Sequence, residues 1–207
     1  MASFVERWSR GTGLPWLKPG VLVGALVPLL VLVRAAYLHK LGADPIAMAL
    51  NRLGLLALVL LLASLSATPL KLMFGWAWPL RVRKLLGLLA FFYACLHFLL
   101  YAVVDQGLAL AAIAKDVTER KFITVGFVAL LLLVPLAVTS TAKMLKRLGA
   151  QRWKRLHRLV YVAAPLAALH FIWRVKKDLS QPLAYALVLG LLLGVRLLPN
   201  KRRAATS

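Results

Sequence analysis

The feature that most constrains this chain is a run of twenty residues without a formal charge, LLGLLAFFYACLHFLLYAVV at 85–104. A helix needs about 20 mainly apolar residues to cross the hydrocarbon core of a bilayer, so this run predicts a membrane-spanning helix. Further stretches share its length and character, and the predicted spans are about 17–38, 53–72, 84–105, 122–142, 153–173 and 180–198. The hydrophobic share of 62% is far above that of a soluble domain. The sequence therefore predicts an all-α polytopic membrane protein, a six-helix transmembrane bundle with short loops.

The basic residues predict how this bundle is oriented. Of the 27 Lys and Arg residues, 18 fall on the termini and on the two connections that share their side, and nine fall on the other three connections. Because cytoplasmic loops are enriched in Lys and Arg, we expect both termini in the cytoplasm. The predicted parts are a cytoplasmic segment 1–16, a transmembrane domain 17–198 and a cytoplasmic tail 199–207. The net charge of +21 is then a topological signal and indicates no nucleic-acid partner.

Three of the four histidines lie inside predicted spans, where an imidazole is costly unless it has a use. His97 lies thirteen residues beyond Lys84, and His170 lies thirteen residues beyond His157. The predicted spans 84–105 and 153–173 both run from the cytoplasmic side to the outer side. His97 and His170 are therefore expected at similar depth in the outer half of the membrane. Two such histidines on separate helices are typical of haem held between helices. Structural polar contacts and a proton or metal pathway are the alternatives.

His157 is expected about 20 Å below His170, near the cytoplasmic face. On an ideal helix the two imidazoles lie about 140° apart, so we expect a kink or local rewinding at Pro165, which lies between them. No histidine of the other helix matches the depth of His157. It is a candidate for a second haem, or for hydrogen bonding to a quinone or flavin.

Four basic residues lie at the level of His157 and are candidate cofactor-binding residues: Arg83, Lys84, Arg155 and Arg158. Arg83 and Lys84 are placed to neutralise a haem propionate or a cofactor phosphate. Arg155 and Arg158 flank His157 and are placed to stabilise a reduced, anionic cofactor. The alternative is that these charges only set the topology.

Several stretches together carry a family resemblance: LGADP at 41–45, RVRKLLGLLAFFYACLH at 81–97, TST at 139–141, RWKRLHRLVYVAAPLAALHF at 152–171 and PLAYA at 182–186. The chain resembles the MsrQ (YedZ) family, the haem-binding membrane subunits of a bacterial system that repairs periplasmic methionine sulfoxide. That family belongs to a wider group of ferric-reductase-like and NADPH-oxidase-like transmembrane domains.

The resemblance implies a multi-pass protein of the bacterial inner membrane, in contact with membrane lipid, that binds haem b (one or two) and FMN. The haem histidines of the family fall on His97, His157 and His170. Electrons are expected from the quinone pool or a flavin donor and pass to a periplasmic molybdenum-containing reductase subunit (MsrP-like), which carries the catalytic site. The alternatives are a ferric-reductase-like or oxidase-like enzyme that reduces a soluble acceptor directly, and a small cation transporter.

Three shorter patterns predict local structure. Gly42 and Pro45 predict a rigid turn that starts a short interfacial helix, and the alternative is that this stretch forms part of a periplasmic docking face. The TST stretch is expected to close the preceding helix, because Ser and Thr satisfy local backbone groups. Trp153 is interpreted as an interfacial anchor.

Overall fold

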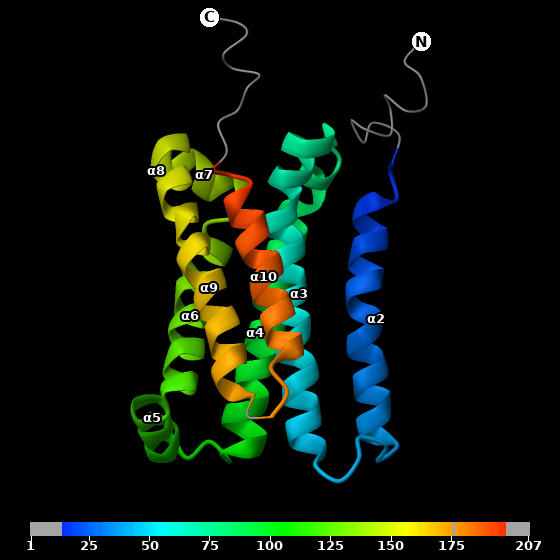
Figure 1. Ribbon diagram of the computed structural model, residues 1–207, viewed down its shortest axis with the longest axis vertical. Helices are drawn as coiled ribbons and strands as arrows, with labels where there is room; N and C mark the ends of the chain where they lie inside the picture. Colours follow the sequence, from blue (N-terminus) through cyan, green and yellow to red (C-terminus); the bar gives the residue numbers. More distant parts are fainter. Residues whose placement is uncertain (1–13, 176, 198–207) are drawn as a thin grey trace, which may run out of the picture.

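The computed structural model describes residues 14–175 and 177–197, and every regular element in these ranges is a helix. The long helices run side by side along one axis and are joined by short connections at the two ends (Figure 1). The all-α prediction is therefore confirmed for the described ranges. The predicted tail 199–207 and most of the predicted segment 1–16 lie outside them.

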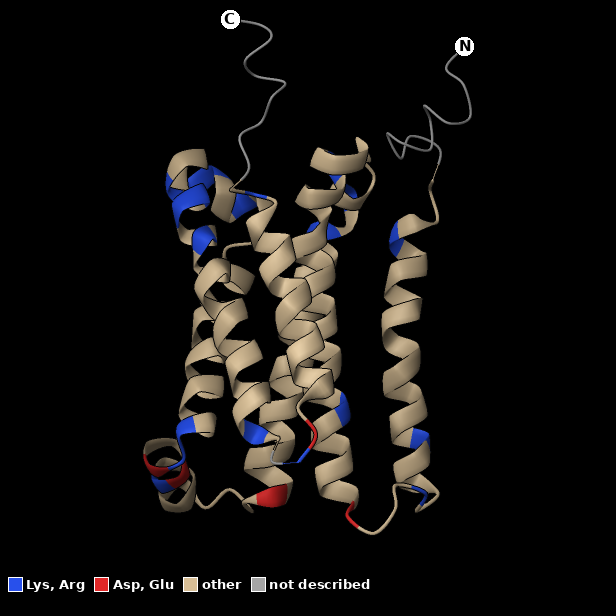
Figure 2. Cartoon of the chain, viewed as in Figure 1, with Lys and Arg blue, Asp and Glu red and all other residues tan. Residues whose placement is uncertain are grey.

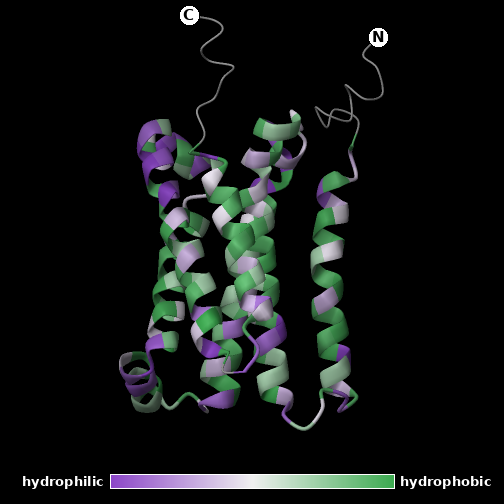
Figure 3. Cartoon of the chain, in the orientation of Figure 1, coloured by the Kyte–Doolittle hydropathy of each residue, from purple (hydrophilic) through white to green (hydrophobic). Residues whose placement is uncertain are grey.

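Within the described ranges, five helices are long and apolar enough to cross a membrane. Their residues are largely hydrophobic (Figure 3), and many of their large apolar side chains are exposed, as expected of lipid-facing helices. They are α2 (Leu17–Tyr37), α3 (Pro45–Phe74), α4 (Pro79–Leu99) with its π-helical extension η1 (Leu100–Asp105), α6 (Lys121–Val138), and the continuous run of α8 (Ala150–Leu156), the 3₁₀ turn η2 (His157–Leu159) and α9 (Val160–Arg174).

The last apolar helix is shorter than predicted. The sequence predicts a span over about 180–198, whereas α10 comprises Ser180–Gly194, 15 residues. A helix of this length rises about 22 Å, less than the roughly 30 Å of a bilayer core. It packs against α9 and α3. The described residues thus form five helices of spanning length and one shorter apolar helix.

The two ends of the bundle differ in charge (Figure 2). Lys and Arg gather at the end that carries α7 (Ala142–Leu148) and α8, here called the basic end. The opposite end carries α5 (Leu110–Glu119) and is here called the acidic end after its Asp and Glu residues, although Lys and Arg residues lie there as well. All the acids within the described ranges lie there: Asp44, Asp105, Asp116, Glu119 and Asp178.

The first turn at the acidic end leads into a helix much longer than predicted. Gly42 adopts a positive φ of 86°, as its sequence context predicts. Asp44 caps the next helix, because its Oδ1 accepts a hydrogen bond from the Ala47 N–H at 2.9 Å, and Pro45 takes the first helical position. The prediction of a short interfacial helix here is wrong: the turn starts α3 itself, which has 30 residues.

Helices α3 and α4 form the centre of the bundle, and α2 stands to one side of it. Tyr93 of α4 is fully buried at 0% exposure, and its hydroxyl donates to the Ala25 carbonyl of α2 at 2.5 Å. This buried hydrogen bond fastens α2 to the bundle.

Candidate functional site

In the described part of the chain, a cavity lies toward each end of the bundle. The acidic-end cavity has a volume of about 300 Å³ and lies between α3, α4, α6 and α9. The basic-end cavity has a volume of about 320 Å³ and lies among the same helices, nearer α8. Leu61 of α3 and Leu133 of α6 line both cavities, so the two spaces share one apolar wall.

The acidic-end cavity brings His97 and His170 together. The two side chains come from α4 and α9, and their ring centres lie 6.1 Å apart with the planes at 77°. Sequence spacing places these histidines at similar depth, and the structure agrees. His157 lies elsewhere, in the wall of the basic-end cavity.

Hydrogen bonds fix which nitrogen of each ring carries the proton. His97 Nδ1 lies 2.9 Å from the Leu50 carbonyl oxygen, and His170 Nδ1 lies 2.7 Å from the Phe122 carbonyl oxygen. A carbonyl oxygen can only accept, so Nδ1 carries the hydrogen in both rings. The lone pair is then on Nε2, the state in which imidazole binds a metal, with the Nδ1 bond fixing ring orientation.

Two glycines let the imidazoles approach these carbonyls. A Cβ on Gly54 would lie 3.2 Å from His97 Cε1, and a Cβ on Gly126 would lie 2.6 Å from His170 Nδ1. Each glycine lies four residues after the carbonyl that accepts the hydrogen bond, at Leu50 and Phe122 respectively. The same arrangement, a carbonyl that accepts from a histidine and a glycine four residues later, therefore occurs on α3 and on α6. A glycine inside an apolar helix is the sequence signal that could have found it.

The distance between the two ring centres equals that expected for two imidazoles bound to one metal atom from opposite sides. A metal–imidazole bond is about 2 Å, and a ring centre lies about 1 Å behind the bonded nitrogen, so two such rings have centres about 6 Å apart. The observed 6.1 Å agrees with this value. The neutral Nε2 atoms and the apolar cavity also suit haem iron. No group of three or more His, Cys, Asp or Glu side chains suited to a bare metal ion occurs in the described ranges.

Polar residues close the acidic end of this cavity, and sequence reasoning missed them. Arg174 and Arg120 are part of the lining. Arg174 donates to the Asn51 side-chain oxygen, and Arg120 forms an ion pair with Asp116 at 3.0 Å. Arg174 follows His170 by four residues, so it lies on the same helical face, which is a signal the sequence does contain. The two guanidinium groups are candidates for binding an anionic group of a cofactor.

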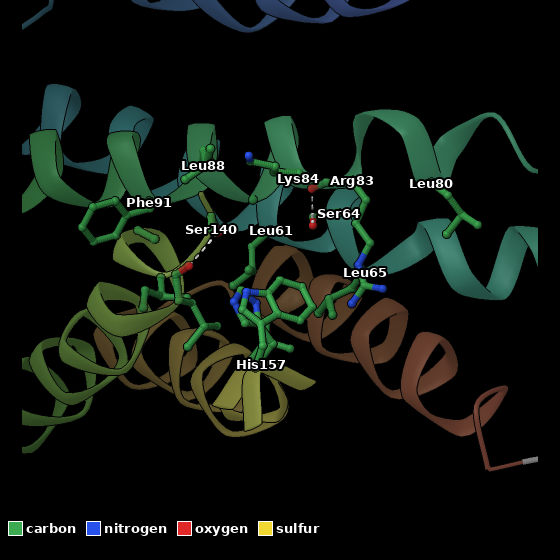
Figure 4. Close-up of a pocket in the computed structure, with 16 residues that line it drawn as sticks. Leu61, Ser64, Leu65, Leu80, Arg83, Lys84, Leu88, Phe91, Ser140 and His157 are labelled. Atoms are coloured by element: carbon green, nitrogen blue, oxygen red, sulfur yellow. Dashed lines mark hydrogen bonds between the residues drawn. The ribbon is translucent and has the colours of Figure 1, made fainter. Parts of the chain in front are cut away.

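At the basic end, Figure 4 shows His157 and Arg83 reaching toward the cavity from different helices. Lys84 lines the same cavity. Arg155 and Arg158 are exposed and line neither cavity, because they fall on the outer side of α8 and η2. Of the four predicted cofactor-binding cations, the structure therefore brings only Arg83 and Lys84 to a cavity.

His157 is held by a network that uses its other nitrogen. Its Nε2 lies 3.2 Å from the Thr139 hydroxyl, which itself donates to the Pro135 carbonyl at 2.5 Å. The hydroxyl has one hydrogen, so it must accept from Nε2–H, and the lone pair of His157 lies on Nδ1. Trp153 stacks on the ring with centres 3.8 Å apart and donates to the Thr139 carbonyl at 2.8 Å. Trp153 is therefore a packing partner of His157 and not only an interfacial anchor.

Rewinding occurs between His157 and His170, although not at the predicted place. Residues His157–Leu159 form the 3₁₀ turn η2, which ends six residues before Pro165, and α9 is α-helical through Pro165. Each residue of a 3₁₀ helix turns by about 120° instead of 100°, which reduces the angle between the histidines from about 140° to about 80°. Both imidazoles can then face the interior of one bundle.

Comparison with known proteins gives one family match and many close relatives. Residues 49–168 match the family described as "Ferric reductase like transmembrane component". A relative from Rhodospirillum rubrum, named "Protein-methionine-sulfoxide reductase heme-binding subunit MsrQ", is 54% identical over 183 residues, which cover 88% of each chain. A relative of the same name from Deinococcus radiodurans is 52% identical over 177 residues, covering 86% of this chain and 87% of the relative.

Proposed function

This chain belongs to the MsrQ family of haem-binding membrane subunits, and from that premise we propose that it transfers electrons to a methionine sulfoxide reductase. The chain itself is the electron-transfer subunit, and the catalytic site is on the partner. The single observation that carries the proposal is the facing pair His97 and His170, with both Nδ1 atoms bonded to backbone carbonyls.

We propose that His97 and His170 hold haem b through their Nε2 atoms. Haem, when bound, supplies a one-electron carrier in the membrane. The protein contributes orientation, because the Leu50 and Phe122 carbonyls fix both rings before the cofactor arrives. Arg120 and Arg174 are placed to bind its carboxylates at the acidic end.

The basic-end cavity is the proposed entry site for electrons. His157, Arg83 and Lys84 line it, and it shares Leu61 and Leu133 with the lining of the acidic-end cavity. A quinone, an FMN or a second haem are the candidate groups. Iron bonding through His157 Nε2 requires the Thr139 hydrogen bond to break, whereas Nδ1 is available to a hydrogen-bond donor. Arg83 and Lys84 provide positive charge for a reduced, anionic group.

The proposed setting is the bacterial inner membrane, with six spans and both termini in the cytoplasm. The charge difference between the two ends supports this orientation, since Lys and Arg favour the cytoplasmic side. The acidic end then faces the periplasm, where the His97–His170 site lies closest to a molybdenum-containing partner of the MsrP type. The span at α10 requires tilted or thinned lipid around its 15 residues.

The experiment follows the reoxidation of purified, dithionite-reduced protein at its haem absorption bands. We expect the cognate periplasmic reductase together with methionine sulfoxide to reoxidise it much faster than buffer does, and to need both components. The match to ferric-reductase-like proteins makes direct reduction of a soluble acceptor the second candidate function. Rapid reoxidation by a ferric chelate alone, with no effect of the reductase, would favour that second function.

A further inference from the structure

A set of side-chain hydrogen-bond donors gathers at the basic end around Pro69, a proline inside α3. Pro69 has no N–H, so the carbonyl of Leu65, four residues earlier, lacks its helical donor. Arg196, just beyond the end of α10, supplies the missing hydrogen bond from its Nη2. The end of the last helix is therefore tied to the body of α3 by a guanidinium group.

Arg196 is held on two further sides, with one donor left over. Its Nη1 donates to the Tyr161 hydroxyl at 2.5 Å, and its guanidinium carbon lies 5.1 Å from the centre of the Tyr161 ring. Its Nε is shielded from solvent and has no hydrogen-bond partner among the described residues. A shielded N–H without an acceptor is costly, so this atom indicates an acceptor that the described chain does not provide.

Arg83 brings a second guanidinium to the same turn of α3. Its Nη1 lies 3.5 Å from the Thr68 hydroxyl, and its own carbonyl accepts from the Ser64 hydroxyl at 2.9 Å. Leu65, which anchors Arg196, and Thr68 are three residues apart, so they lie on one helical face about 5–6 Å from each other. Two guanidinium groups therefore converge on one short stretch of α3.

No carboxylate of the described ranges balances these two charges. The acids there all lie at the acidic end of the bundle. Residues 198–207 contain no Asp or Glu, and Glu6 is the only acid in residues 1–13. The two guanidinium groups therefore have no carboxylate partner among the described residues and are available to an external anion.

We propose that Arg196 and Arg83 form a binding site for a phosphate group, supplied by a phospholipid headgroup or by free phosphate. Guanidinium groups match phosphate through paired N–H donors, and each Nη of Arg196 keeps one N–H beyond those given to Tyr161 and Leu65. The shielded Nε gains an acceptor only when the side chains that cover it move aside. The partly exposed ring of Tyr161 and the end of an apolar helix place the site where lipid headgroups lie. The site does not include His97 or His170, whereas Arg83 also lines the basic-end cavity and so belongs to both proposals.

The test is thermal unfolding of the full-length protein, delipidated in detergent. Phosphatidylglycerol, phosphatidylcholine with the same acyl chains, and inorganic phosphate at equal ionic strength are added separately. In the wild type, we expect phosphatidylglycerol to raise Tm more than phosphatidylcholine does. In Arg196→Gln, we expect the apparent affinity for phosphatidylglycerol to be about tenfold weaker. Lys71→Gln, which removes an exposed charge from the same end of α3, should behave as the wild type. A rise with inorganic phosphate as well identifies free phosphate as a sufficient ligand.

Two further variants protect the test against a folding defect. Arg83→Gln should weaken the phosphatidylglycerol effect without removing the Leu65 hydrogen bond, and Arg196→Lys should recover part of it. Equal stabilisation by phosphatidylglycerol of the wild type, Arg196→Gln and Arg83→Gln would overturn the site. The absence of any response to either phosphatidylglycerol or phosphate in the wild type would overturn it too.

Discussion

Gly126 lies directly against the imidazole of His170: a Cβ at this position would be 2.6 Å from Nδ1. That nitrogen is also the one that donates to the Phe122 carbonyl, one helical turn before the glycine. The missing side chain of one helix therefore sets the position of a histidine on another.

The first prediction is that Gly126→Ala displaces His170 and lowers haem content several-fold. The contact is too short for a methyl group, so the ring must move and lose a hydrogen bond of about 1 kcal/mol. Gly54→Ala should have a smaller effect, since its Cβ would lie 3.2 Å from the His97 ring. Haem per polypeptide, measured by the pyridine haemochrome method, checks both.

Gly190→Ala is the matched control, because a Cβ on this glycine of α10 meets nothing within 4 Å. It should keep its haem, with unchanged or slightly raised thermal stability. Haem content in Gly126→Ala equal to that in Gly190→Ala would show that the close contact does not position His170.

The second prediction concerns entry of electrons at His157. His157→Ala should slow reduction by quinol or a flavin donor while leaving the absorption of the His97–His170 site in place. Thr139→Val removes the hydroxyl that accepts from His157 Nε2, and it should also slow haem reduction, by a smaller factor than His157→Ala does. Stopped-flow reduction of the haem bands measures both. If His157→Ala is reduced at the wild-type rate and keeps its haem and flavin content, His157 has only a packing role.

The third prediction is the orientation of the basic end. A reporter fused after Ser207 should be active if it requires the cytoplasm and inactive if it requires the periplasm. The reason is the excess of Lys and Arg at the end that carries α7 and α8. An active periplasmic reporter at this position would reverse the orientation, and with it the assignment of the partner to the acidic end.

The sequence predicted the helices and the matched depth of His97 and His170 because both follow from length and spacing. A helix rises by a fixed amount per residue, so equal distances from the same membrane face give equal depth. The location of the apolar spans is likewise set by bilayer thickness. These properties need no knowledge of which helices touch.

The sequence did not predict contacts between helices. The fit of Gly54 and Gly126 to the two imidazoles depends on how α3 packs on α4 and α6 on α9. The exposure of Arg155 and Arg158 follows from the rotation of α8 and η2, which one-dimensional spacing does not fix. The 3₁₀ turn at His157 was missed for the same reason, since Pro165 was the only local signal of rewinding.

The most direct test of the account is the haem ligation of the facing histidines. Wild type, His97→Ala, His170→Ala and the surface control His39→Asn are purified from haem-replete cells and compared by absorption and low-temperature EPR. Asn suits the positive φ of 52° at position 39. The account predicts a low-spin bis-histidine signal in the wild type and in His39→Asn, and its loss in both alanine variants while each protein still inserts in the membrane. Retention of that signal in either His97→Ala or His170→Ala would contradict the proposed pairing.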